Sequence, residues 1–215
     1  MSELLDVIPV FPLPKVVLFP QVQLPLHIFE SRYREMVRDV ADTAQPLIGM
    51  ALLRGEWQEQ YDGNPPIFPI GCVGKIVKTV PLPGGRFNIL LQGLREYRIQ
   101  EEFNDKSYRQ ARVEWLPEKT DPLASGRREE LGHLLEDYLQ KKEAVQKLMT
   151  DPGVDDTLFI NFFAFQLEFL PIEKQSLLNA ATLGERAACL KDILEFKLIE
   201  TRWPESGRGG KPRLH

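Results

Sequence analysis

The stretch IPVFPLPKVVLFPQVQLPLHIFESRYREMV, residues 8–37, contains the change of pattern that decides the fold. Up to Leu26, short β-branched and aromatic runs are interrupted by prolines at positions 9, 12, 14, 20 and 25. Because proline cannot donate a hydrogen bond to a neighbouring strand, these runs predict strands that lie at a sheet edge or bend sharply. Apolar residues then recur at helical spacing, which predicts one helix near residues 29–40.

Strand patterns continue after this helix. Segments with strand signals occupy residues 47–53, 72–80, 86–92, 94–100 and 108–116, and residues 86–92 alternate in polarity. Short strands at such regular spacing favour a small barrel or sandwich. Residues 54–66 are polar with late turn residues and are expected to form an exposed loop. Proline and charge end the β pattern at residues 116–122, which predicts a boundary near residue 117.

The second half of the chain has helical patterns. Apolar residues spread over 131–149 predict one long amphipathic helix that stops before the Asp-Pro-Gly turn at 151–153. A shorter helix is expected over residues 172–180. The pattern T-x-x-E at Thr182–Glu185 predicts a capping box at the start of the last helix.

A phenylalanine-rich segment lies between these helices. Asp155 and Asp156 can cap a helix that runs from there to Leu170. This helix is apolar nearly all the way round, which is typical of the centre of a bundle. Phe162 and Phe163 are therefore expected to be buried.

Together these patterns predict an α+β fold with two lobes. Residues 1–117 are expected to form a β-rich lobe, a small barrel or sandwich with its single helix, and residues 118–204 a C-terminal helical bundle. Residues 205–215, rich in glycine and basic residues, are expected to be a disordered tail.

The composition argues against several classes of protein. The formal net charge is −4, so no global positive field attracts a polyanion, and we expect no nucleic-acid partner. No apolar stretch approaches the roughly 20 residues that a membrane helix needs, and the N-terminus lacks the basic start of a signal peptide. The two cysteines, Cys72 and Cys189, suit a reducing compartment. A cytoplasmic protein without a membrane segment is expected.

Motifs for nucleotide or metal chemistry are missing from the sequence. Gly210-Lys211 does not complete a phosphate-binding loop, because Glu205 replaces the first glycine and Pro212 the required hydroxyl. The histidines, at 27, 133 and 215, form no zinc motif, and no serine lies in a nucleophile elbow. We therefore expect no catalytic residue, no metal ligand and no cofactor. A catalytic triad assembled from distant residues stays open, although His27 and His133 are expected to be structural residues in apolar surroundings.

Several segments carry a family resemblance. The opening stretch, the run Ile70–Gly74 followed by Ile76, and GGRFNILLQGLREYRI at 84–99 resemble the N-terminal substrate-binding domain of Lon proteases. FLPIEKQSLLN at 169–179 and GERAACLKDIL at 184–194 are similar to its helical half. One departure is Glu96-Tyr97, where the family commonly has Arg-Phe. The family's ATPase and peptidase segments have no counterpart in the sequence, so a stand-alone form of the domain is expected.

The resemblance implies a PUA-like β-barrel lobe packed beside a helical bundle. It also implies recognition of unfolded or damaged polypeptide without catalysis. Expected partners are unfolded or hydrophobic polypeptide segments and a protease or chaperone, and the expected state is a monomer or weak dimer. An RNA-binding PUA-like module and a hydrolase with a dispersed site are the alternatives.

The candidate peptide-binding residues are Phe29, Glu30, Arg32 and Tyr33. Phe29 and Tyr33 are spaced to share the apolar face of the helix, where packing is their default role, while Glu30 and Arg34 are spaced to pair on the outer face. Arg32 lies beside the apolar face and can hold a peptide carbonyl or carboxylate. An extended peptide can add to the proline-rich strands, or the prolines can simply protect the sheet edge. The groove between the lobes is the alternative location.

Overall fold

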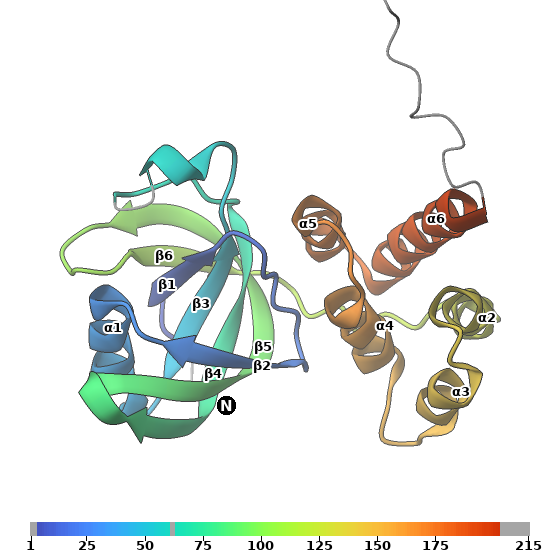
Figure 1. Cartoon of the computed structure of the whole chain (residues 1–215), viewed down its shortest axis with the longest axis horizontal. Helices are drawn as coiled ribbons and strands as arrows, with labels where there is room; N and C mark the ends of the chain where they lie inside the picture. Colours follow the sequence, from blue (N-terminus) through green and yellow to red (C-terminus); the bar gives the residue numbers. More distant parts are fainter. Residues whose placement is uncertain (1–3, 61–62, 203–215) are drawn as a thin grey trace, which may run out of the picture.

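The computed structural model describes residues 4–60 and 63–202 and shows strands in the first half of the chain and most helices in the second (Figure 1). The strands are β1 (Val7–Leu13), β2 (Gln23–Ile28), β3 (Leu47–Leu52), β4 (Ile70–Leu82), β5 (Arg86–Phe103) and β6 (Gln110–Trp115). The helices are α1 (Ser31–Ala41), α2 (Arg127–Leu139), α3 (Lys142–Thr150), α4 (Asp156–Gln166), α5 (Pro171–Asn179) and α6 (Leu183–Arg202). Short 3₁₀ turns occupy Trp57–Gln60 and Pro83–Gly85. The α+β prediction is confirmed.

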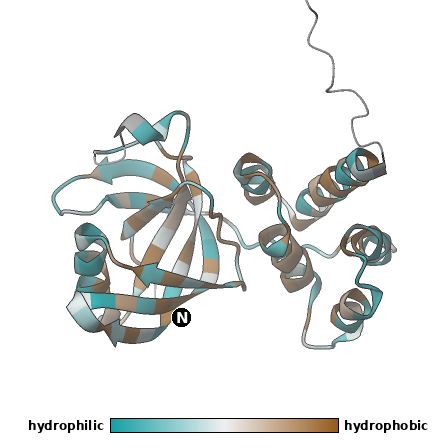
Figure 2. Ribbon diagram, viewed as in Figure 1, coloured by the Kyte–Doolittle hydropathy of each residue, from teal (hydrophilic) through white to brown (hydrophobic). Residues whose placement is uncertain are grey.

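One curled, mixed sheet forms the β lobe. Its strand order is β2-β5-β4-β3-β1-β6, and β6 pairs in addition with the second half of β5. Strands β1 and β3 are parallel, and the other pairs are antiparallel. Apolar residues concentrate on the inner surfaces of the strands and helices (Figure 2). The core of the β lobe therefore lies inside the curled sheet, with α1 covering one opening.

The proline-rich strands have different positions in the sheet. β2 is an edge strand, one of the two positions predicted for the proline-rich runs, whereas β1 is interior. β1 tolerates its prolines because it changes partner along its length: residues 7–9 pair with β6 and residues 10–13 pair with β3. Each segment thus makes ladder contacts mainly on one side.

Strand β5 runs through the position where the sequence suggested a break between residues 92 and 94. A Cβ at Gly93 would lie 2.1 Å from the carbonyl oxygen of Phe19, so only glycine lets the turn at 19–22 approach the strand. The amide of Gly93 donates to the Val22 carbonyl at 2.8 Å. Gly93 therefore marks a close approach of two backbones rather than a turn.

The helical lobe departs from the prediction in two places. The single helix expected over 131–149 is two helices, α2 and α3, because Gln140 adopts a left-handed conformation with φ of 54°. The helix expected to reach Leu170 ends at Gln166. Its start is as predicted, with the Asp155 carboxylate accepting from the amide of Leu158 at 2.7 Å. The tail prediction for 205–215 lies outside the described residues.

Polar contacts join the two lobes. Asn161 of α4 donates to the Pro20 carbonyl at 3.1 Å, and Gln175 of α5 donates to the Ile70 carbonyl at 3.0 Å. Asp121, in the segment between the lobes, accepts from the Leu183 amide at 2.9 Å and so caps α6. The lobes are therefore fixed to one another by buried side chains as well as by the connecting chain.

Candidate functional site

The β2–α1 junction holds the four candidate residues, and Arg32 links the side chains of Glu30 and Tyr33 there. Tyr33 is buried, with its ring 4.1 Å from that of Phe11. Phe29 is 61% exposed, and its ring stacks 6.1 Å from that of His27. The expectation that Phe29 packs on the apolar face of the helix is wrong, because the helix begins at Ser31 and Phe29 precedes its N-cap residue.

The charges at this junction are also paired differently. Glu30 forms an ion pair with Arg32 at 3.0 Å, and the Arg32 guanidinium lies 4.8 Å from the centre of the Tyr33 ring. Arg34 donates instead to the Gly84 carbonyl at 2.7 Å. The predicted Glu30–Arg34 pair fails because Glu30 has an extended backbone outside the helix, where helical spacing does not apply.

A small polar hollow lies beside Arg32 and Tyr33. Its volume is about 60 Å³, and Asn64, Tyr108 and Arg109 contribute to its wall. Ligand pockets are usually at least about 300 Å³, so this hollow is too small to take an apolar side chain together with its backbone. The junction presents an exposed aromatic ring rather than a pocket.

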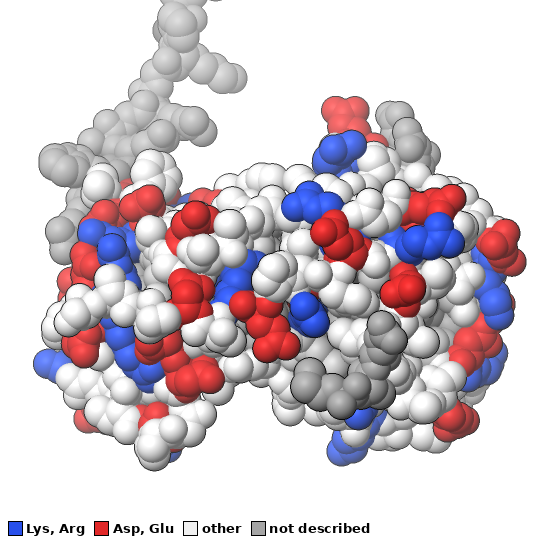
Figure 3. All heavy atoms as spheres, turned by 180° about the vertical axis from the view of Figure 1, so that it is seen from behind, with Lys and Arg blue, Asp and Glu red and all other residues white. Residues whose placement is uncertain are grey.

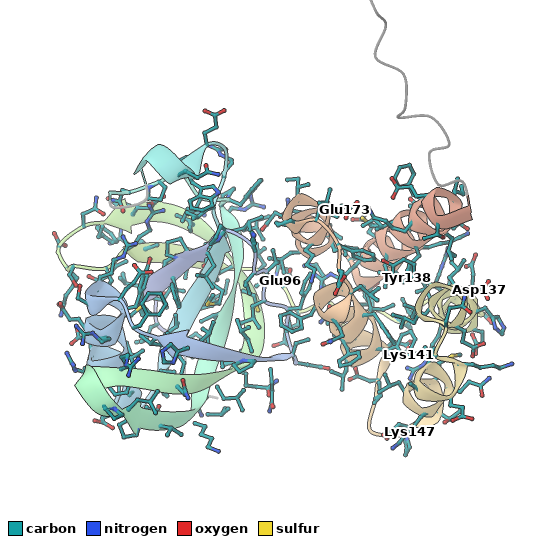
Figure 4. The ribbon with its side chains drawn as sticks, viewed as in Figure 1. Glu96, Asp137, Tyr138, Lys141, Lys147 and Glu173 are labelled. Carbon is teal, nitrogen blue, oxygen red and sulfur yellow. The ribbon has the colours of Figure 1, made fainter. Side chains whose placement is uncertain are left out.

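The helical lobe contains a much larger hollow, a groove of about 480 Å³ between α2, α3 and α4. We call it the helical groove. It is lined by Tyr138, Leu139, Lys141, Ala144, Val145, Leu148, Phe162, Phe163, Gln166, Leu167 and Glu168. Figure 4 labels Tyr138 and Lys141 on the α2–α3 side of the lobe.

The groove has an apolar floor and a polar rim. Val145, Phe163 and Leu167 are buried at its base. Phe162 is only partly buried and packs edge to face on Phe163 with ring centres 5.3 Å apart. The expectation that both phenylalanines are buried therefore holds for Phe163 and is wrong for Phe162. Lys141 and Glu168 are exposed at the rim.

The residues of this groove were missed at the level of sequence because the break at Gln140 was not recognised. That break separates α2 from α3, and both helices then border the same stretch of α4. A usable signal was the α4 segment itself, which is apolar on all faces. A helix of that kind is normally covered on every side, so it indicates that several other helices lie against it.

The two described histidines each lie beside a group that is not a hydroxyl or thiol nucleophile. His27 is hydrogen-bonded to Asn88 at 2.7 Å, and His133 is 78% exposed, 4.0 Å from the Glu136 carboxylate. Both histidines are at the surface, so the expectation of apolar surroundings is wrong. Ser107 donates to Glu35 rather than to a histidine. Among the residues with coordinates, no cluster of three potential metal ligands occurs.

A family model described as the ATP-dependent protease La (LON) substrate-binding domain matches residues 7–195. The chain belongs to this family. The Lon protease of Cytophaga hutchinsonii is 25% identical and covers 90% of this chain, and that of Trichlorobacter lovleyi is 29% identical and covers 88%. The chain spans 24% of the length of each of these relatives. The similarity therefore concerns the substrate-binding domain and not the remainder of Lon.

Solved Lon N-terminal domains share the fold. The N-terminal domain of the Mycobacterium avium complex Lon protease superposes with a TM-score of 0.67 at 18% identity and covers 88% of this chain. The Lon N-terminal domain protein from Xanthomonas campestris gives 0.66 at 24% identity and covers 89%. These matches cover 98% and 99% of the two solved chains, so the Lon fold includes both lobes described above.

No helix of the described part of this Lon-family chain is long and apolar enough to cross a membrane. Its two cysteines, Cys72 and Cys189, are both free thiols. On the face drawn in Figure 3, acidic and basic side chains are mixed over both lobes, without a broad field of one sign.

Proposed function

We propose that this chain recognises unfolded or damaged polypeptide without catalysis, by binding apolar segments of it in the helical groove. The observation that carries the proposal is the groove itself, a hollow of about 480 Å³ with a floor of Val145, Phe163 and Leu167. A pocket of roughly 300 to 1,000 Å³ with mainly apolar lining suits one or two large side chains of a bound chain. Membership in a substrate-binding domain family supports the same reading.

The groove favours polypeptide over a small polar substrate. Unfolded chains expose large apolar side chains, and their burial contributes about 1.5 to 3 kcal/mol each. The rim charges Lys141 and Glu168 have opposite signs, so they select no single charge on the ligand. This arrangement suits recognition of exposed hydrophobic segments in general rather than of one sequence.

Phe29 with Glu30, Arg32 and Tyr33 provides a second contact surface in this proposal. The exposed Phe29 ring offers an apolar contact, and the paired Arg32 and Glu30 follow it at the start of α1. Strand addition at β2 is less favoured, because Pro25 removes one donor from the six residues of this edge strand. A protease or chaperone that receives the bound polypeptide, and action in the cytoplasm, complete the proposal.

The test uses a permanently unfolded protein, reduced and carboxymethylated lactalbumin, in a fluorescence binding assay. Ala144→Glu places a carboxylate in the groove on an exposed position of α3. We expect about tenfold weaker binding, because the carboxylate must lose water when an apolar segment binds.

Gln146→Glu is the matched control. It puts the same group on the same helix at an exposed position outside the groove lining. Equal binding by the two variants would show that the helical groove is not the binding surface.

A further inference from the structure

A second groove, of about 460 Å³, lies on the β lobe between α1 and the hairpin formed by β4 and β5. In Figure 1 this hairpin runs beside α1, away from the helical lobe. We call the space between α1 and this hairpin the hairpin groove. It is lined by Val37, Arg38, Ala41, Asp42, Ile76, Val77, Lys78, Thr79, Pro81 and Phe87. Its floor is largely aliphatic, and Val77 is 49% exposed there.

Helix α1 separates its charges between two sides. Glu35 accepts from Ser107, and Asp39 accepts from both Lys106 and Tyr108 at 2.8 and 2.7 Å. Both carboxylates therefore face the turn between β5 and β6, where Lys106 offsets part of their charge. The sequence of α1 looks nearly balanced in charge, but its acidic groups are turned away from the hairpin.

Two basic groups of α1, Arg34 and Arg38, face the hairpin, whereas Arg32 pairs with Glu30. Arg34 donates to the Gly84 carbonyl at 2.7 Å, and the Arg38 guanidinium lies 5.9 Å from the centre of the Phe87 ring. The hairpin adds Lys78 to the groove wall and Arg86 at its tip, where Arg86 donates to the Pro83 carbonyl at 3.1 Å. Four cations are thus gathered along one side of α1.

These cations are not neutralised by neighbouring carboxylates. Within residues 4–60 and 63–202, every ion pair involves other side chains, and Arg34, Arg38, Lys78 and Arg86 take part in none. Asp42 is the acidic residue of the lining. The hairpin groove therefore combines an apolar floor with a surplus of positive charge, in a chain whose net charge is −4.

We propose that the hairpin groove is a docking site for an acidic polypeptide segment that inserts an aliphatic side chain between α1 and the hairpin. The aliphatic floor receives the anchor, and Arg38 and Lys78 pair with carboxylates on either side of it. Charge complementarity of this kind selects the partner and speeds its association. The site is independent of the helical groove, which lies on the other lobe and has rim charges of both signs.

A polypeptide fits the groove better than a single-stranded nucleic acid does. Nucleic-acid grooves combine cations with aromatic rings on which bases stack. Phe87 is the aromatic residue of this lining, it is partly buried, and Arg38 lies over its ring. The other floor residues are aliphatic and offer a side-chain pocket instead of a stacking platform.

The experiment measures binding of fluorescein-labelled peptides to the whole chain by anisotropy at low salt. The probe is a nine-residue peptide of alternating Glu and Leu, compared with the matching Lys and Leu peptide. We expect the acidic peptide alone to bind and its affinity to fall with added salt. Equal binding of the two peptides would overturn the proposal, and so would tighter binding of a nine-nucleotide oligouridine.

Two double variants then locate the site. Arg38→Glu with Lys78→Glu reverses the groove charges and should weaken binding of the acidic peptide by about tenfold or more. Lys15→Glu with Arg54→Glu makes the same change in net charge at exposed positions outside the groove and should leave binding unchanged. Equal losses in both double variants would mean that binding depends only on net charge and would refute a docking site in the hairpin groove. Ala144→Glu and Gln146→Glu each add one negative charge, and we expect them to weaken binding of the acidic peptide equally. Because Ala144→Glu alters the helical groove and Gln146→Glu does not, this equality would show that the acidic peptide does not bind in the helical groove.

Discussion

Arg186 of α6 and Glu96 of β5 form an ion pair in the interior between the two lobes, where their side chains are 0% and 3% exposed. Arg186 donates in addition to the Asn161 side chain at 2.5 Å and to the Leu177 carbonyl at 2.9 Å. The side-chain nitrogen of Lys119 contacts the second oxygen of the same carboxylate. One glutamate therefore joins the sheet both to the helical lobe and to the connecting segment, as the position of Glu96 in Figure 4 indicates.

Removing the Glu96 carboxylate should destabilise the whole chain. Glu96→Ala leaves Arg186 buried without a counter-charge, and breaking a buried pair in this way costs about 3 to 5 kcal/mol. Urea unfolding followed by circular dichroism measures this loss. Glu101→Ala is the control, because its pair with Arg112 is about half exposed and should contribute no more than about 1 kcal/mol. Similar losses in both variants would contradict a special role for the buried pair.

The same cluster predicts a dependence of stability on pH. Burial and the neighbouring Arg186 lower the pKa of Lys119 to about 7. Between that value and the ordinary pKa of about 10.5, the unfolded chain binds a proton that the folded chain lacks, so stability rises with pH. Below about pH 7 Lys119 is protonated in both the folded and the unfolded chain, so it gives stability no further dependence on pH there.

Lys119→Met should remove that dependence. The free energy of unfolding of the native chain should rise between pH 7 and 8.5, and that of the variant should rise less. The range stops there because burial raises the pKa of Cys72 from 9.0 to about 12, which makes stability fall once the unfolded thiol ionises. Parallel curves for the two proteins would show that Lys119 keeps its proton in the folded state.

Sequence patterns predicted the element types well and the long-range contacts poorly. Alternation and helical spacing depend on neighbouring residues, so the strands, the α4 cap at Asp155 and the β-then-α order were available from sequence. Glu96 stood out only as a departure from the Lon pattern. Its role depends on Arg186, which is 90 positions later in the chain. No local pattern links two such residues.

The candidate site shows the same limit. Phe29 continued the apolar spacing of α1, but the extended backbone of Glu30 ends that spacing before the helix begins. The helical groove depended on a left-handed residue, Gln140, within a continuous helical pattern. In both cases a single backbone conformation changed which side chains are exposed, and side-chain periodicity does not report backbone conformation.

The two adjacent phenylalanines of α4 should differ in their effect on stability. Phe163→Ala removes a ring that is 3% exposed and should cost about 3 to 5 kcal/mol. Phe162→Ala should cost clearly less, because part of that ring already faces the helical groove. Thermal unfolding of the two variants under identical conditions checks the order. The reverse order would mean that Phe162 rather than Phe163 contributes more to the packing of the helical lobe.

The surface at the β2–α1 junction can be tested without disturbing the fold. Phe29→Ala removes a ring that is 61% exposed, so we expect only a small loss of stability. A loss of about 1 kcal/mol shifts the melting temperature by roughly 2 to 4 °C in a chain of this size. The melting temperature of the variant should therefore stay within a few degrees of that of the native chain. The double variant Glu30→Ala with Arg32→Ala removes both members of a partly exposed pair and should cost about 1 kcal/mol.

If this junction contacts unfolded polypeptide, both variants should bind reduced, carboxymethylated lactalbumin several-fold more weakly. Leu94→Ala, at a β5 side chain 38% exposed and away from the junction, is the control and should bind normally. Normal binding by all three variants would leave the helical groove as the contact for unfolded chains and would remove Phe29, Glu30 and Arg32 from the site.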